Sequence, residues 1–146
     1  MKVEVESLDS FRERARSFIR ANLRPVSKRA VSSSLRADKT DEEELAAVAH
    51  ERKLQRMLFD AGLAGVCVAR EYGGQGLTPA HQRCLNAELR GYEYPSRLQV
   101  PTFTPCLAVL LEFGTEEQKQ KHVPAILKGE ELWMQFLSEP SCGSDV

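Results

Sequence analysis

The chain has 146 residues, of which 42% are hydrophobic and 28% are charged, with nine glycines and seven prolines. This length fits about one domain, and the composition is that of an ordinary globular protein, which excludes a disordered chain, a collagen and a coiled coil. Twenty basic and 21 acidic residues nearly cancel, so a dedicated nucleic-acid-binding protein is not expected.

The first helix is predicted to begin at a capping box. Ser10 and Glu13 have the spacing of this motif, and apolar residues follow at helical intervals until Pro25 closes the helix. Residues 26–40 contain few apolar side chains and predict a connecting loop.

A second capping box, formed by Thr40 and Glu43, predicts a helix that ends at Gly62. The segment that follows contains three glycines within residues 73–76. Such a density of glycine indicates positive φ angles or a close approach of backbones, so a shaped loop is predicted here.

Two helices are predicted in the next part of the chain. The third helix is capped by Thr78, has Pro79 at its first position and runs to about Gly91. The fourth spans about residues 103–113 and is apolar on every side, which predicts burial or the lining of an apolar cavity.

Thr115 and Gln118 predict the cap of a fifth, polar helix that Pro124 kinks or ends. After this helix, the apolar run over residues 132–137 predicts a strand. The expected fold is therefore all-α, an up-and-down helical bundle over residues 1–130, with a short β segment at the C-terminal end over residues 131–146.

Cysteine and histidine spacing gives no support to a metal site. The three histidines have no ligand-like spacing to the cysteines, and the cysteines form no C-x-x-C pair: Cys67, Cys84, Cys106 and Cys142. We expect reduced, buried thiols, as in a cytosolic protein.

The longest uncharged stretch covers residues 98–111 and is interrupted by Pro101 and Pro105, so it is too short to span a membrane as a helix. The first six residues include Glu4 and Glu6 and contain no apolar run, unlike a secretory signal or a transit peptide. A cytoplasmic location is the default expectation.

Four motifs stand in a fixed order along the chain. They are Tyr72-Gly73-Gly74 with Gly76-Leu77-Thr78, Phe113 to Lys119, Leu127 to Glu130, and Gln135 to Pro140 with Gly143 to Asp145. In order and spacing, the chain resembles the acyl-CoA dehydrogenase family over about residues 8–146. The resemblance implies the N-terminal helical domain and the first strand of the middle β-domain of an enzyme that desaturates an acyl-CoA thioester and transfers hydride to FAD.

The resemblance places the flavin beside Gln135, Leu137 and Ser138, and the FAD pyrophosphate beside Gly143 and Ser144, with Ser144 also close to the CoA arm. The residue types suit these roles, because a hydroxyl at a strand end can donate to the polar rim of a flavin. Small residues in a turn also let backbone N–H groups approach a phosphate. The alternative is a tight turn between two strands.

For the acyl chain, the apolar segment over residues 98–111 is the candidate, with Leu98 and Phe103 as substrate-binding residues. Core packing explains the same residues equally well. The reaction requires a carboxylate base, which the family places in its C-terminal helical domain, so no catalytic residue is assigned in this chain. Glu139 is interpreted as a turn residue.

The chain is therefore expected to be one piece of a longer protein and to be inactive by itself. The partners implied by the resemblance are an acyl-CoA substrate, electron-transfer flavoprotein as the electron acceptor, and the subunits of a homo- or hetero-tetramer. Two alternatives remain open: a non-catalytic helical subunit of an acyl-CoA dehydrogenase assembly, and an acyl-CoA oxidase-type flavoenzyme.

Overall fold

The computed structural model describes residues 5–26 and 40–135 of the chain, and within these ranges the fold is all-α, as predicted. An isolated antiparallel bridge between Pro25 and Tyr92 joins two of the connections. The helices, in chain order, are α1 (Leu8–Asn22), α3 (Asp41–Asp60), the 3₁₀ helix η1 (Arg70–Tyr72), α4 (Pro79–Glu88), α5 (Ser96–Pro101), the π-helix η2 (Thr102–Leu107), α6 (Ala108–Phe113) and α7 (Glu116–Lys128).

The predicted caps of the later helices are confirmed, and that of the first is wrong. Thr40 and Thr115 each form a reciprocal capping box with the residue three positions later. Helix α1 instead begins at Leu8, because Ser7 is the residue whose side chain accepts a hydrogen bond from the Ser10 backbone N–H, at 3.2 Å.

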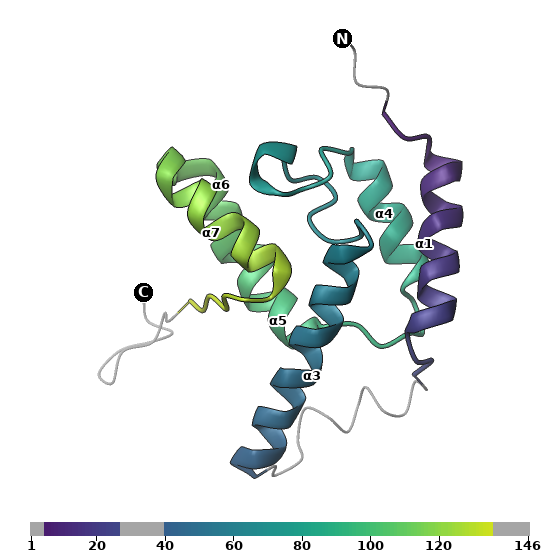
Figure 1. Cartoon of the computed structure of the whole chain (residues 1–146), viewed down its shortest axis with the longest axis horizontal. Coiled ribbons are helices and arrows are strands. Elements are labelled where there is room, and N and C mark those ends of the chain that lie inside the picture. The colour runs from purple at the N-terminus through teal and green to yellow at the C-terminus, as the bar shows by residue number, and fades with distance from the viewer. Residues whose placement is uncertain (1–4, 27–39, 136–146) are drawn as a thin grey trace, which may run out of the picture.

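Helix α3 lies between two groups of helices. Figure 1 shows α1 and α4 side by side on one side of α3, and α6 and α7 on the other. The first part of α3 extends away from both groups, and its Leu45 is 70% exposed. Each of the two groups encloses its own cluster of buried side chains.

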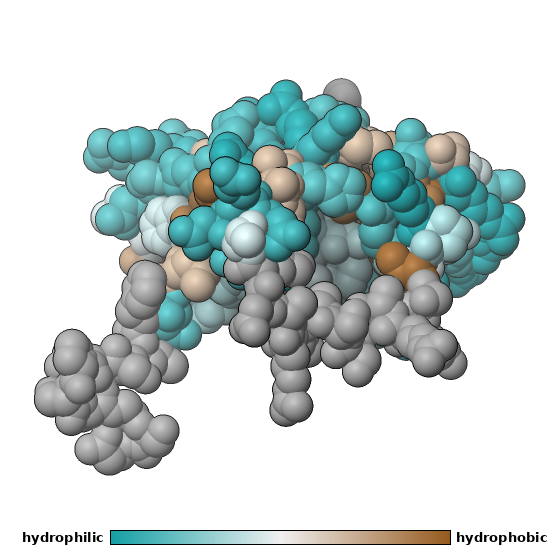
Figure 2. All heavy atoms as spheres, turned by 90° about the horizontal axis from the view of Figure 1, so that it is seen from below, coloured by the Kyte–Doolittle hydropathy of each residue, from teal (hydrophilic) through white to brown (hydrophobic). Residues whose placement is uncertain are grey.

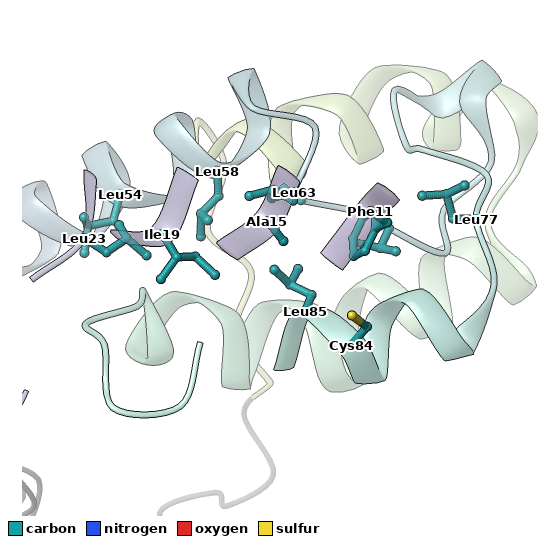
Figure 3. Close-up of a cluster of buried hydrophobic side chains, with 12 residues drawn as sticks. Phe11, Ala15, Ile19, Leu23, Leu54, Leu58, Leu63, Leu77, Cys84 and Leu85 are labelled. Carbon is teal, nitrogen blue, oxygen red and sulfur yellow. The ribbon is translucent and has the colours of Figure 1, made fainter. Parts of the chain in front are cut away.

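The first core is enclosed by α1, α3 and α4. Phe11, Ala15 and Ile19 lie on one face of α1, and none of them is more than 1% exposed. Figure 3 shows these side chains meeting Leu58 of α3 and Leu85 of α4. The spacing of four residues along α1 is what brings its three buried side chains onto one face.

The second core is built around α7. It consists of Val68, Tyr72, Leu107, Leu110, Val123, Ile126 and Leu127, which come from η1, η2, α6, α7 and the loop before η1. The Tyr72 hydroxyl donates a hydrogen bond to Glu116 Oε2 at 2.7 Å, and this bond to a carboxylate raises the pKa of Tyr72 to about 12.

Gln55 joins α3 to α7 and to α5. Its side chain is completely buried, and its Nε2 donates to the Leu127 carbonyl oxygen of α7 at 2.7 Å. Its Oε1 accepts from Gln99 Nε2 of α5 at 2.8 Å. A buried amide with both ends satisfied ties α3 to the second group without leaving an unpaired polar atom.

The glycine-rich loop has the shape that the sequence predicts. Gly73 and Gly76 have φ angles of 85° and 60°, which favour glycine. A Cβ atom at Gly74 would collide with the backbone carbonyl of Val68. The loop is therefore architectural: its backbone folds back on residues 65–69, with Gln75 N donating to the Gly65 carbonyl at 3.0 Å.

Several other predictions are wrong in their details. The predicted fourth helix begins earlier, at Ser96, and Pro124 lies inside α7 without ending it. Of the strand predicted over residues 132–137, the described residues up to 135 are not paired, because a strand requires a neighbouring strand and the described residues provide none. Residues 136 and 137 lie outside the described residues. Of the cysteines, Cys84 is buried and Cys106 is half-buried, but Cys67 is exposed. Cys142 lies outside the described residues.

Candidate functional site

An apolar groove lies between three segments of the chain, beside the second core. It has a volume of about 430 Å³. Residues of η2 and α6 contribute Pro105, Cys106, Val109, Leu110 and Phe113, α7 contributes Gln118 and His122, and the segment after α7 contributes Trp133, Met134 and Gln135.

The apolar side chains of the groove are unusually open to solvent. Val109 is 57% exposed, Phe113 80% and Met134 60%, whereas Leu107 and Leu110 of the same helical run are buried. The prediction of burial for residues 103–113 therefore holds for Leu107 and Leu110, of which Leu110 also borders the groove, whereas Val109 and Phe113 line the groove with exposed side chains. On the face of the molecule seen in Figure 2, hydrophobic residues form only small separate patches among hydrophilic ones.

Two prolines explain the irregular helix beside the groove. Pro101 and Pro105 lack a backbone N–H, so the regular hydrogen-bond ladder cannot continue past them. Over Thr102–Leu107 the helix widens into a π-helix and then returns to an α-helix at Ala108. Such π-helical turns occur frequently at functional sites.

Polar groups gather at the rim of the groove. Glu131 accepts hydrogen bonds from Trp133 Nε1 at 2.8 Å and from His122 Nδ1 at 2.8 Å. Burial alone would raise the pKa of Glu131, but the hydrogen bonds from Trp133 and His122 hold it below its ordinary value. The carboxylate is thus charged at neutral pH, which requires that His122 Nδ1 carries the hydrogen.

The fold places the predicted site residues in different environments. Leu98 is buried and only 5% exposed, on α5, which packs against α3. Phe103 is half-buried against the second core. Gln135 is exposed and lies on the groove. Leu137, Ser138, Gly143 and Ser144 lie outside the described residues.

Sequence reasoning missed the polar rim. His122 and Glu131 are nine positions apart and on opposite sides of the end of α7, so no short motif connects them. The sequence predicts Gln118 only as part of a helix cap, and it predicts Phe113 both as part of a motif at a helix end and as part of the apolar helix over residues 103–113. The exposure of Phe113 depends on which face of α6 packs against α7, and the sequence alone does not contain this information.

Residues 5–26 and 40–135 contain no cluster of three side chains suited to holding a metal ion. In the same part of the chain, none of the helices combines the length and the apolar character that crossing a bilayer requires.

Comparison with known proteins decides the family. The domain described as "Acyl-CoA dehydrogenase, N-terminal domain" matches residues 6–130. The chain belongs to the acyl-CoA dehydrogenase family. This family of oxidoreductases is the one that the motifs indicate, and its N-terminal domain matches the whole helical region of this structure.

Three relatives show the range of similarity within the acyl-CoA dehydrogenase family. The chain is 36% identical over 99 residues to acyl-CoA dehydrogenase FadE34 of Mycobacterium tuberculosis, covering 66% of this chain and 13% of that protein. It is 34% identical over 94 residues to mitochondrial isovaleryl-CoA dehydrogenase of Solanum tuberosum, covering 64% and 23%. It is 27% identical over 137 residues to the Arabidopsis thaliana isovaleryl-CoA dehydrogenase, covering 93% and 31%. The chain thus spans less than a third of each of these relatives.

Proposed function

We propose that this chain forms the N-terminal helical part of an FAD-dependent acyl-CoA dehydrogenase, which desaturates an acyl-CoA thioester between its α and β carbons, and that the groove receives the acyl chain. The observation that carries the proposal is the exposed apolar face of η2 and α6 within a chain of this family. A volume of about 430 Å³ with apolar walls and few polar groups suits a small organic ligand.

Of the two predicted acyl-chain residues, Phe103 is the better candidate. It lies in the π-helix beside the groove and remains partly accessible, whereas Leu98 is buried in the packing between α5 and α3. For Leu98 we therefore favour core packing, which the sequence left as an equal alternative. The groove residues Val109 and Phe113 are better placed to contact an acyl chain.

The residues at the end of the described chain fit a flavin. An isoalloxazine ring has apolar faces and a polar rim, and Met134 and Gln135 present a thioether and an amide side by side at the groove. We propose that Gln135, with Leu137 and Ser138, holds this ring. Gly143 and Ser144 are proposed to hold the pyrophosphate, and Ser144 also the CoA arm. When bound, FAD would supply the hydride acceptor.

For the whole protein we propose a helical domain over residues 1–130, followed by the start of a β-domain over residues 131–146. The matched family region ends at residue 130, just after α7, which supports this boundary. Electron-transfer flavoprotein as the acceptor, a homo- or hetero-tetrameric assembly and a cytoplasmic location complete the proposal.

No residue of this chain is proposed as the catalytic base. We therefore expect the chain alone to be inactive and to hold FAD at most weakly.

Trp133 provides the test, because it is the single tryptophan of the chain and lines the groove. Titration of the purified chain with octanoyl-CoA should change the fluorescence of Trp133 saturably, and free CoA should have a much smaller effect. Val109→Asp should weaken the binding of octanoyl-CoA by about tenfold or more, because a charge replaces apolar contact area.

Val100→Asp is the matched control. Val100 is also an exposed valine, 61% accessible, but it does not line the groove, so its variant should bind octanoyl-CoA like the unmodified chain. The proposal fails if octanoyl-CoA leaves the fluorescence unchanged, or if both variants weaken binding equally. A flavin absorption spectrum of the same preparation tests the FAD expectation, which stoichiometric, tightly held FAD would contradict.

A further inference from the structure

The segment that leaves α7 is attached to the helical body at successive points. The backbone N–H groups of Glu130 and Glu131 both donate to the Ala125 carbonyl oxygen, at 2.9 and 3.3 Å. The next attachment is at Trp133, whose N–H donates to Thr102 Oγ1 at 3.3 Å while Thr102 Oγ1 donates to the Trp133 carbonyl oxygen at 3.1 Å. Thr102 is only 1% exposed, so this attachment is made to a buried part of η2.

The side chains reinforce the backbone attachment. The Glu131 carboxylate receives the indole N–H of Trp133 and the imidazole Nδ1–H of His122, both at 2.8 Å. The His122 and Trp133 rings also meet edge to face, with centroids 5.2 Å apart. One carboxylate thus holds an aromatic ring of the outgoing segment against a ring of α7.

Met134 and Gln135 are the last two residues that the structure describes, and within the described chain they make no hydrogen bonds like those of residues 130–133. Met134 and Gln135 are exposed, and both line the groove. The direction in which they leave the helical body is therefore determined at Trp133, the last residue that both its backbone and its side chain fix in place.

We propose that Glu131 is a positioning residue, which clamps the Trp133 indole against His122 and so holds residues 133–135 as an ordered wall of the groove. The role of this wall in ligand binding rests on the proposed function, which assigns the groove to the acyl chain and Gln135 to the flavin. The clamp itself is a property of the unliganded chain. Without the carboxylate, the two N–H donors lose their shared acceptor, and the indole is free to leave His122.

The first test uses the chain without ligand. In Glu131→Ala, acrylamide should quench Trp133 fluorescence about twofold more strongly, and the amide of Trp133 should exchange its hydrogen about tenfold faster, because the local segment opens more often. His122→Ala should change both measurements in the same direction by a smaller amount. Circular dichroism should show that the helices of both variants are retained.

Glu130→Ala is the matched control, because Glu130 is the adjacent carboxylate and pairs instead with Arg56, at 3.1 Å. Its quenching and amide exchange should equal those of the unmodified chain. If Glu131→Ala behaves like Glu130→Ala in both measurements, the clamp is overturned, whatever octanoyl-CoA does.

The second test connects the clamp to the groove. If octanoyl-CoA binds the unmodified chain, Glu131→Ala should weaken that binding about threefold or more, since ordering the loose wall then opposes binding. Equal affinity in the two proteins would contradict the role of the wall in binding. If octanoyl-CoA binds neither protein while the quenching and exchange results hold, the proposed function fails and the clamp stands.

Discussion

The two cores of this molecule are built from similar side chains but differ in how completely they are covered. In the first core, α1 packs against α4 and side chains of α3 complete the cluster, so that Phe11 has no exposed surface. In the second core, α6 buries Leu110 against α7 but leaves Phe113 80% exposed beside the groove. The first core therefore serves stability, and the second leaves apolar surface available for a ligand or for another part of the protein.

Shortening one phenylalanine in each region should produce the largest difference between them. Phe11→Ala is expected to lower the free energy of unfolding by about 3–5 kcal/mol, because it leaves a cavity in a closed core. Phe113→Ala should change it by less than about 0.5 kcal/mol, because its ring is already in contact with water. Urea denaturation of the two variants measures both values. Equal losses of unfolding free energy in the two variants would show that the two phenylalanines are equally well packed.

The glycine loop and residues 65–69, on which it folds back, lie between the two cores. Val66 and Leu77 belong to the first core, and Val68 belongs to the second. Gly74→Ala should lower the free energy of unfolding by about 1–3 kcal/mol, because the added methyl group meets the Val68 backbone. Gly91→Ala is the control: its φ of 83° is also positive, but nothing lies within 4 Å of a Cβ there.

Gly91→Ala should therefore cost only the backbone strain, about 1 kcal/mol. Thermal and urea denaturation of both variants would measure this difference. A smaller effect at Gly74 than at Gly91 would mean that the loop accommodates the methyl group and is not a rigid connection between the cores.

The smallest expected effect is electrostatic and belongs to the first region. Arg14 donates to both carboxylate oxygens of Glu6, at 3.2 and 2.9 Å, and this interaction lowers the pKa of Glu6 from its ordinary value of 4.5. Because the folded-state pKa is the lower one, the stabilisation is present above the unfolded-state value and is lost as the pH falls through the folded-state value.

At pH 7, Glu6→Gln should lower the free energy of unfolding by about 0.2–1 kcal/mol, as is typical of partly exposed ion pairs. Urea denaturation at a series of pH values from 7 downward should show that the difference between variant and unmodified chain shrinks as the pH falls through the lowered pKa of Glu6, because the protonated Glu6 carries no charge. A difference that persists at low pH would assign the effect to packing or hydrogen bonding.

Local signals in the sequence correctly predicted where three of the helices begin. Thr40, Thr78 and Thr115 each precede a helix in the structure. The Thr40 and Thr115 side chains each accept a hydrogen bond from a backbone N–H three residues later, and Thr78 instead contacts the His81 ring three residues later. The same reasoning failed at Ser10, since Ser7 competes for the same role three positions earlier. Of the two outcomes predicted at Pro124, a kink or a helix end, the end is wrong, because α7 continues to Lys128 with Val123 and Ile126 buried in the second core.

The candidate site was predictable only in part. Its apolar segment and Gln135 are visible in the sequence, but the partners of the polar rim are not. Glu131 and Trp133 are close in sequence, and yet their contact matters only because α7 brings His122 beside them and η2 brings Thr102. Contacts between separate helices depend on how the helices pack, which a pattern within one segment does not reveal.

By itself, the sequence determined the helical class, the capped helix starts, the shape of the glycine loop and, through its motifs, the family. Those features depend on interactions between near neighbours in the chain. Only the tertiary structure decided which face of an evenly apolar helix is exposed, because Val109 and Leu110 are equally hydrophobic and differ only in what packs against them. The groove exists because packing against α7 buries Leu110 at its edge and leaves Val109 and Phe113 open.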